Sequence, residues 1–418
     1  MAVELNQLLG TSGDDALSGT VEGDMIDALE GNDTVHAGDG DDYVEGNSGN
    51  DFLYGDAGDD DLIGGTGNDW FFAELGSDNY DGGLGEDGLD LSLSASAVSI
   101  DTTTGLVTDS FGVSNTVTDV EVFNGSAFDD IFIGKDTDNN APIELNAAIA
   151  ATGNYELFIG KQGADYIDGK GGYDEISLAS ATEGLTIDLA QSTVQDGLGG
   201  TDTILNIEGV EGTNFNDIIY GTSGANSLDG RLGNNVIDGK AGYDFVEYNG
   251  HARTNLQLDL AAGVATFSHN GVDYTDTLLN IEGVVGSHNN DVITGDSSAN
   301  KIYGLTGDDQ LFGGGGDDTY TVYLGWGHET ISDTSGNDTL RVDLTGSTGS
   351  AWSFKRVGDD LVYTTNDVET VGYTIVDQFA GQAIENYELI VLDNPTWTRI
   401  DWVLNSGAEL LGQNEILA

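Results

Sequence analysis

Aspartate recurs at every ninth residue near the start of the chain, and this spacing is the pattern most able to do chemistry. Each of these acids is followed two residues later by an apolar residue, as Asp51 is by Leu53 and Asp69 is by Phe71. Carboxylates at a fixed interval stack into columns when a chain coils regularly, and such columns repel unless cations lie between them. Sites made of several carboxylate and carbonyl oxygens suit calcium best. The aspartates of this uninterrupted array are Asp15, Asp24, Asp33, Asp42, Asp51, Asp60, Asp69, Asp78 and Asp87.

The nine-residue unit around each acid predicts a turn followed by a short strand. Its clearest copy is Gly64–Phe72, and consecutive units run from residue 10 to residue 90. The first six residues form a glycine-rich turn whose carbonyls can point inward, and the last three form a strand whose middle residue faces a core. One such strand buries too little surface to be stable alone, so the units must coil and stack.

Two units make one coil of 18 residues, which places alternate acids on opposite sides of the coil. Stacked coils lie about 4.8 Å apart, so acids one coil apart can share a cation. The column that starts at Asp15 contains four such pairs, and the column that starts at Asp24 contains three. The array therefore predicts seven calcium sites.

The unit Gly-Gly-x-Gly-x-Asp-x-apolar-x resembles the RTX nonapeptide, the repeat of proteins exported by type I secretion. The resemblance implies an all-β fold, a parallel β-roll or β-solenoid, in which each calcium ion lies between a loop and the loop one coil further on. The unit returns in three later patches, which are residues 125–133 with 160–177, residues 212–247 and residues 286–321. The sixth positions in these patches are Asp130, Asp165, Asp174, Asp217, Asp244, Asp291, Asp309 and Asp318, with Asn226, Asn235 and Asn300 in the other three. Asparagine keeps a carbonyl ligand but lacks the charge of aspartate, so calcium sites that include an asparagine should be weaker.

Three inserts separate these patches, and each carries alternating apolar runs that predict strands. Leu185–Leu189 and Leu256–Leu260 are two of these runs. We expect the inserts to be wider coils of the same solenoid. Glu121, Glu208 and Glu282 fall at equivalent places near the insert ends. These glutamates are either extra ligands or carboxylates that cap a strand turn.

The pattern divides the chain into four regions. Residues 1–9 form an N-terminal cap, residues 10–90 the β-roll, residues 91–340 the patches that alternate with inserts, and residues 341–418 a C-terminal β cap with a secretion-signal region. The last four residues, Glu-Ile-Leu-Ala, resemble the uncleaved signal of type I secretion, and the first residues lack the basic and apolar segments of an N-terminal signal peptide. Within the patch formed by residues 125–133 and 160–177, residues 141–157 are expected to be a short helical excursion.

Composition limits the partners of the chain. There are 74 acidic residues against 11 basic ones, a formal net charge of −63, which disfavours nucleic acid and anionic membrane surfaces. Cysteine is absent, which excludes disulfides and thiolate metal sites. No apolar run approaches the ~18 residues of a membrane helix. The partners we expect are calcium, a type I secretion transporter, further copies of the chain and cell-surface polysaccharide.

No catalytic motif accompanies the repeats. The sequence contains neither a His-Glu-x-x-His zinc motif nor a Gly-x-Ser-x-Gly elbow. We therefore expect a secreted, non-catalytic calcium-binding protein with a structural role in a surface layer, matrix fibre or adhesive coat. One alternative is a polysaccharide lyase or epimerase on the insert solenoid, for which His251 with Arg253 and Tyr248 is the only candidate cluster. The other alternative is a soluble binder of calcium or exopolysaccharide.

Overall fold

The computed structural model describes residues 6–109, 114–136, 155–250, 252–323, 327, 329–336 and 338–341. It also describes the backbone, without side chains, of residues 342–343 and of five strands between residues 352 and 402. The chain forms two compact units, Met1–Asn214 and Phe215–Ala418. Each unit consists of strands and turns in the described residues, which confirms the predicted all-β class. The same residues include no helix with the length and apolarity of a membrane span.

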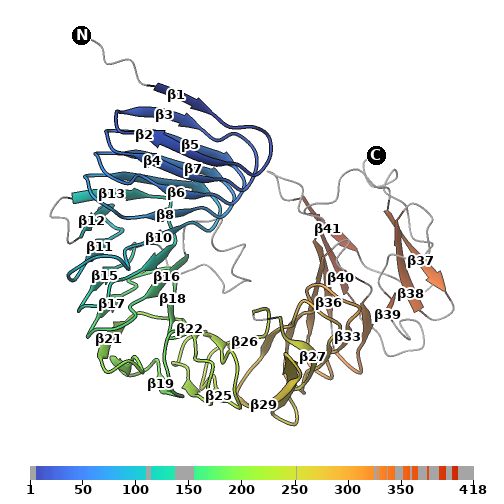
Figure 1. The fold of residues 1–418 in the computed structure, drawn as a ribbon. Helices are drawn as coiled ribbons and strands as arrows, with labels where there is room; N and C mark the ends of the chain where they lie inside the picture. Colours follow the sequence, from blue (N-terminus) through green and yellow to red (C-terminus); the bar gives the residue numbers. More distant parts are fainter. Residues whose placement is uncertain are drawn as a thin grey trace. The chain divides into compact units, whose positions relative to one another are not determined.

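The first unit begins as a roll of two parallel sheets (Figure 1). Neighbouring strands within a sheet are one coil apart, because Leu17 lies opposite Val35 and Val44 lies opposite Leu62. The coil is therefore 18 residues long, as the nine-residue unit predicts. One sheet contains β1 (Asn6–Leu9), β3 (Asp24–Asp27), β5 (Tyr43–Ser48), β7 (Asp61–Thr66) and β9 (Asn79–Leu84), and the other contains β2 (Ala16–Thr20), β4 (Thr34–Gly38), β6 (Phe52–Tyr54), β8 (Trp70–Phe72) and β10 (Gly88–Asp90).

The apolar residue at the eighth position of each unit forms the core between the two sheets. Ile26, Val35, Val44 and Leu53 are all 0% exposed. Side chains alternate across a strand, so one apolar residue in each short strand is enough to fill the interior. Burial of each such side chain contributes about 1.5–3 kcal/mol. These contacts confirm the predicted parallel β-roll.

Glycine at the fourth position of most units allows the turns to stack closely. Gly49 has φ of 139°, and a Cβ there would lie 1.6 Å from the carbonyl oxygen of Gly31, one coil earlier. A larger residue would therefore push adjacent coils apart as well as strain its own backbone. Glycine at this position keeps the coils at the spacing that brings their acids together.

The inserts add antiparallel strands to one sheet of the roll instead of forming simple wider coils. In the first insert, the last strand, β13 (Ser114–Thr118), pairs in parallel with β9 of the preceding repeat. The chain order is β11 (Ser99–Asp101), β12 (Leu106–Thr108) and β13, joined by antiparallel pairing. The first strand, β11, then pairs in parallel with β15 (Ile131–Ile133) of the following repeat. The insert strands are thus present as expected, but two additional strands per insert widen the sheet.

The second insert shows the same use of antiparallel strands. Its strand β20 (Thr193–Gln195) pairs antiparallel with β21 (Thr201–Leu205), and β21 pairs in parallel with β17 (Tyr166–Asp168). Strand β19 (Thr186–Asp188) lies within the apolar run expected at residues 185–189. The other sheet of this unit continues through β14 (Val122–Asn124), β16 (Tyr155–Ile159), β18 (Tyr173–Ser177) and β22 (Gly209–Glu211).

The second unit repeats this architecture. Its insert strands β27 (Thr254–Asp259), β28 (Val264–His269) and β29 (Val272–Leu279) pair antiparallel in chain order. Strand β29 also pairs in parallel with β25 (Val236–Asp238), and β27 pairs in parallel with β31 (Val292–Thr294). One sheet contains β23 (Ile218–Tyr220), β25 (Val236–Asp238), β31 (Val292–Thr294), β33 (Gln310–Phe312) and β35 (Thr330–Ser332), and the other contains β24 (Ser227–Asp229), β26 (Phe245–Glu247), β30 (Gly283–Val285), β32 (Lys301–Tyr303), β34 (Thr319–Tyr323) and β36 (Thr339–Asp343).

The C-terminal strands have the topology of a further insert. Strands β37 (Trp352–Val357), β38 (Asp360–Thr365) and β39 (Thr374–Ile375) pair antiparallel in chain order, and β39 pairs in parallel with β35. On the other sheet, β40 (Asn386–Val391) pairs with β36 and with β41 (Thr398–Trp402). The strands expected in this region are therefore present.

Three expectations fall wholly or partly outside the described residues. They are the first five residues of the N-terminal cap, most of the helical excursion at residues 141–157, and the last four residues of the chain. Of the excursion, only Tyr155–Leu157 is described, and it belongs to strand β16.

Candidate metal sites

The acids at the sixth position of each unit form two hydrogen-bonded columns. The backbone N–H of Asp33 donates to Oδ1 of Asp51 at 2.7 Å, and the N–H of Asp51 donates to Oδ1 of Asp69 at 2.8 Å. The same bond joins all seven loop pairs of the first array, at donor–acceptor distances between 2.6 and 3.1 Å. The structure therefore brings together every pair that the sequence places one coil apart.

In most of these carboxylates, the second oxygen is buried without a hydrogen-bond partner. Asp51 is 1% exposed and Asp69 is 0% exposed, so water does not solvate this oxygen. A buried charged oxygen without a partner is costly unless a cation lies beside it. In the first array the unpartnered oxygens are Asp24 Oδ1 and Oδ2 of Asp33, Asp42, Asp51, Asp69 and Asp87.

Burial and mutual repulsion disfavour the charged form of these acids in the metal-free protein. The pKa of Asp60 is raised to about 8, mainly by burial, and repulsion from the carboxylates of Asp78 and Asp42 contributes to this rise. The pKa of Asp69 is raised to about 7, again mainly by burial, with a contribution from Asp87 and Asp51. At neutral pH the columns can be fully ionised only when cations balance them.

Glycine at the first position lets the unpartnered oxygen lie close to the backbone of its own turn. A Cβ at Gly46 would lie 2.4 Å from Oδ2 of Asp51, and a Cβ at Gly64 would lie 2.3 Å from Oδ2 of Asp69. Carboxylate and carbonyl oxygens gathered in such a turn are the donors that calcium prefers, so the residues fit this ion.

In some loops, a serine or threonine donates hydrogen bonds to the sixth-position acid. The backbone N–H and the hydroxyl of Ser126 donate to Asp130 at 2.7 and 2.6 Å, and Ser287 makes the same two bonds to Asp291 at 2.6 Å each. Thr11 does the same for Asp15, which is also only partly buried. These three acids remain expected ligands, and each also accepts hydrogen bonds from a serine or threonine in its own loop.

The later patches contain both kinds of loop. Oδ2 is buried and unpartnered in Asp165, Asp174, Asp244, Asp309 and Asp318, as in the first array. By contrast, Asn235 accepts the N–H of Asp217 at 2.9 Å, while its own amide donates to the carbonyl oxygen of Gly230 at 3.0 Å. The side-chain amide of Asn235 thus supplies a hydrogen bond to the Gly230 carbonyl oxygen, which a cation would otherwise contact.

The inserts continue both columns. Glu121, Glu208 and Glu282 accept the N–H of the preceding sixth-position aspartate at 3.1, 3.1 and 3.0 Å. They therefore occupy the sixth position of the next coil, which is consistent with either role expected for them. In the opposite column, the corresponding acceptors are Asn115, Asp202 and Asp276, at 2.9, 3.0 and 2.8 Å.

Sequence reasoning missed these three residues and also Glu156. Asn115 and Asp202 each lie 37 residues after the aspartate that donates to them, and this shared interval was a usable signal. Glu156 lies opposite Asp174 in the strand register, is 3% exposed and has an unpartnered Oε1. Its nonapeptide is interrupted by the segment that was expected to be helical, so no regular spacing marks it.

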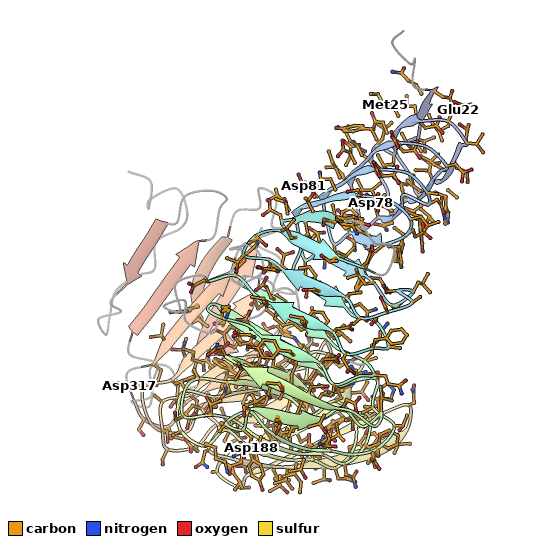
Figure 2. The ribbon with its side chains drawn as sticks, turned by 90° about the vertical axis from the view of Figure 1, so that its left-hand side faces the viewer. Glu22, Met25, Asp78, Asp81, Asp188 and Asp317 are labelled. Carbon is orange, nitrogen blue, oxygen red and sulfur yellow. The ribbon has the colours of Figure 1, made fainter. Side chains whose placement is uncertain are left out.

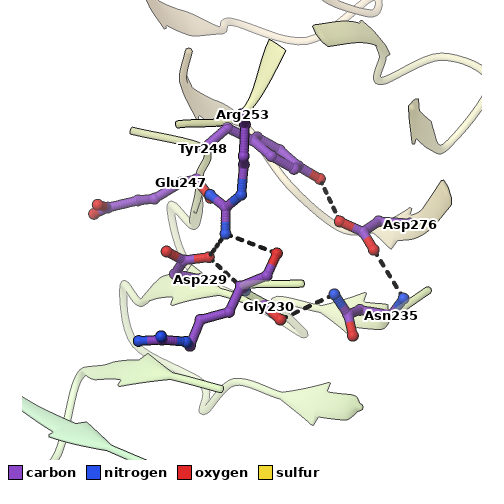
Figure 3. Close-up of polar contacts among 8 residues, drawn as sticks. Asp229, Gly230, Asn235, Glu247, Tyr248, Arg253 and Asp276 are labelled. Atoms are coloured by element: carbon purple, nitrogen blue, oxygen red, sulfur yellow. Dashed lines mark hydrogen bonds and ion pairs between the residues drawn. The ribbon is translucent and has the colours of Figure 1, made fainter. Parts of the chain in front are cut away.

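The cluster proposed for a polysaccharide enzyme is buried in the second unit (Figure 3). The Arg253 side chain is 0% exposed and forms an ion pair with Asp229 at 2.5 Å, while its Nη1 donates to the carbonyl oxygen of Glu247. Tyr248 is 1% exposed and donates its hydroxyl hydrogen to Asp276 at 3.0 Å. Both side chains thus stabilise the interior of the solenoid. His251, the third member, lies outside the described residues.

Comparison with known proteins identifies the repeats. The family model described as the RTX calcium-binding nonapeptide repeat (4 copies) matches residues 18–53, 54–89, 158–177, 211–246, 285–320 and 323–342. These stretches include all the predicted aspartate ligands except Asp15 and Asp130. No curated protein matches the chain.

Proposed function

Because the chain belongs to the proteins built on RTX calcium-binding nonapeptide repeats, we propose that it is a secreted structural protein that folds when it binds calcium. The observation that carries this proposal is the pair of carboxylate columns with buried, unpartnered oxygens. The predicted ligands are Asp15, Asp24, Asp33, Asp42, Asp51, Asp60, Asp69, Asp78, Asp87, Asp130, Asp165, Asp174, Asp217, Asp244, Asp291, Asp309 and Asp318, of which all but Asp15 are buried.

Calcium supplies both the charge balance and the missing ligand partners of this fold. Extracellular calcium modules bind at roughly 10⁻⁴–10⁻³ M, far above cytosolic calcium, so the chain would remain unfolded before export. An unfolded chain suits export by a type I transporter, and the net charge of −63 opposes collapse in the absence of calcium. Folding would then follow in the extracellular medium.

The N-terminal end of the roll supports a role in assembly. Strand β1 pairs with β3 and strand β2 with β4, and no other described strand covers the outer edges of β1 and β2. Leu8 and Leu17 at this end are partly exposed, whereas Ile26 of the next coil is 0% exposed. An open strand edge with a partly exposed core invites pairing with another chain. We infer that copies join through this end when calcium balances their charge, giving fibres or sheets.

Light scattering and electron microscopy test this role. The protein at concentrations well above micromolar should form assemblies in millimolar calcium, and chelator should dissolve them. Leu8→Lys should weaken assembly, while Leu84→Lys, a matched change at a 72% exposed leucine elsewhere on the roll, should not. Monomers alone in millimolar calcium would exclude the structural role and leave the soluble binder of calcium or exopolysaccharide. Release of reducing sugar from anionic polysaccharide would instead establish the enzyme.

A further inference from the structure

Three carboxylates converge at the C-terminal end of the described repeats. Asp318 precedes β34, Asp333 follows β35 and Asp338 precedes β36. One carboxylate oxygen from each lies within 4.8 Å of the other two, and the three residues are 1%, 6% and 0% exposed. The sequence prediction includes only Asp318, because the other two lie on a coil with a 20-residue register instead of an 18-residue one.

One oxygen at this point is left without a partner. Oδ2 of Asp318 is buried and has no hydrogen-bond partner. The carboxylates and the Tyr320 hydroxyl approach the backbone closely because residue 313 is glycine. A Cβ at Gly313 would lie 2.2 Å from Oδ2 of Asp318, 2.2 Å from the Tyr320 hydroxyl oxygen and 2.5 Å from Oδ2 of Asp333. The unpartnered buried oxygen and the convergence of the three carboxylates together point to a cation.

Asp333 distinguishes this place from the sites of the first array. It stands at the first position of a nonapeptide whose sixth residue is Asp338, a position that is glycine or alanine throughout the first array. Its carboxylate is held by the Tyr320 hydroxyl, which donates to Oδ2 at 2.5 Å, and by the N–H of Ser335, which donates to Oδ1 at 3.1 Å. These two hydrogen bonds thus hold the carboxylate of Asp333 beside those of Asp318 and Asp338.

The electrostatics agree with this geometry. The pKa of Asp318 is raised to about 7, mainly by burial, and the negative charges of Asp333 and Asp338 contribute to this rise. A divalent ion would remove this repulsion. The affinity of calcium sites increases with the number of charged ligands and with the rigidity of the site.

We propose that Asp318, Asp333 and Asp338 together bind one calcium ion, and that this site binds more tightly than the two-carboxylate sites of the first array. The inference rests on the proposed calcium-dependent function and assigns a third ligand, Asp333, that the repeat pattern does not contain. The site would fill first as calcium rises, and residues 313–341 would be the first to become ordered.

Calcium titration of the full chain against a competing chelator tests the third ligand. Asp333→Asn keeps the shape of the side chain and removes its charge, while Asp317→Asn is the control, because Asp317 is exposed in the same turn (Figure 2). Asp333→Asn should weaken the tightest site by at least about tenfold, as expected when one charge about 4 Å from a partly buried ion is lost. Asp317→Asn should leave that site unchanged. Equal affinities in the two variants would overturn the proposal, while the proposed function would stand.

Hydrogen exchange of the wild-type chain provides a test that needs no variant. At one equivalent of calcium, protection should appear first in residues 313–341, and terbium at one equivalent should protect the same segment. Protection that appears first in the array at residues 10–90 would contradict the proposal. A wild-type chain that binds no calcium would defeat the proposal and the proposed function together.

Discussion

Asp51→Ala should remove two calcium ions from the first array. Asp51 accepts the N–H of Asp33 and donates its own N–H to Asp69, so its carboxylate adjoins the loops on both sides. Its Oδ2 is buried and unpartnered, and its side chain is 1% exposed. The substitution removes one proposed ligand from each of the two neighbouring sites and leaves the N–H of Asp33 without its acceptor.

The cost of this substitution follows from calcium linkage. At calcium 100-fold above the dissociation constant, each ion stabilises the fold by about 2.7 kcal/mol, so two ions contribute about 5 kcal/mol. Loss of the hydrogen bond to a charged acceptor adds about 1.5–3 kcal/mol. In chelator, the same substitution should cost far less, since it also removes a buried charge that burial disfavours.

Titration calorimetry and denaturant unfolding in calcium measure these effects. The matched control is Asp61→Ala, which removes the same charge from an exposed position on β7 of the same array. Asp51→Ala should bind two fewer ions than Asp61→Ala and unfold at a lower denaturant concentration. The same stoichiometry in both variants would refute the shared-site arrangement.

Three further outcomes are expected. In chelator, the β signal in circular dichroism should be stronger at pH 5 than at pH 8. The raised pKa values of Asp60 (about 8) and Asp42 (about 6) make the metal-free fold bind more protons than the unfolded chain, so the stability of this fold decreases as pH rises through this range. In saturating calcium the order should reverse, because protons compete with the ion. Arg253→Met should lower the stability of the calcium-loaded protein by about 3–5 kcal/mol in thermal or denaturant unfolding, because Asp229 keeps a partly buried charge without its partner; no change would mean that the ion pair is dispensable. Removal of residues 400–418 should abolish export from cells that carry a matching type I transporter, and normal secretion of the truncated chain would contradict the proposed route.

The repeating part of the fold could be predicted because one residue type at one spacing determines it. Asp51 and Asp69 are two nine-residue units apart, and this spacing predicted the 18-residue coil. The apolar residues that follow them, Leu53 and Phe71, predicted the core. These positions depend only on contacts between adjacent coils, which repeat identically. The pairing of the predicted acids followed from the same register.

The remaining site residues could not be predicted because their spacing depends on the length of the antiparallel insertions. Asp276 lies 41 residues after Asn235, whereas Asp202 lies 37 residues after Asp165, since the third insert has longer strands than the second. The donors that satisfy Asp130 depend on the hydroxyl and the backbone conformation of Ser126. Neither property alters the aspartate spacing from which the ligands were inferred.

Circular dichroism of the full chain, with calcium removed and then restored, tests the central claim most directly. The account predicts an unfolded spectrum in excess chelator at neutral pH and the full β signal after addition of millimolar calcium, because the buried carboxylates lack other partners for their second oxygens. A full β signal already present in chelator at neutral pH would contradict the claim that calcium folds this protein.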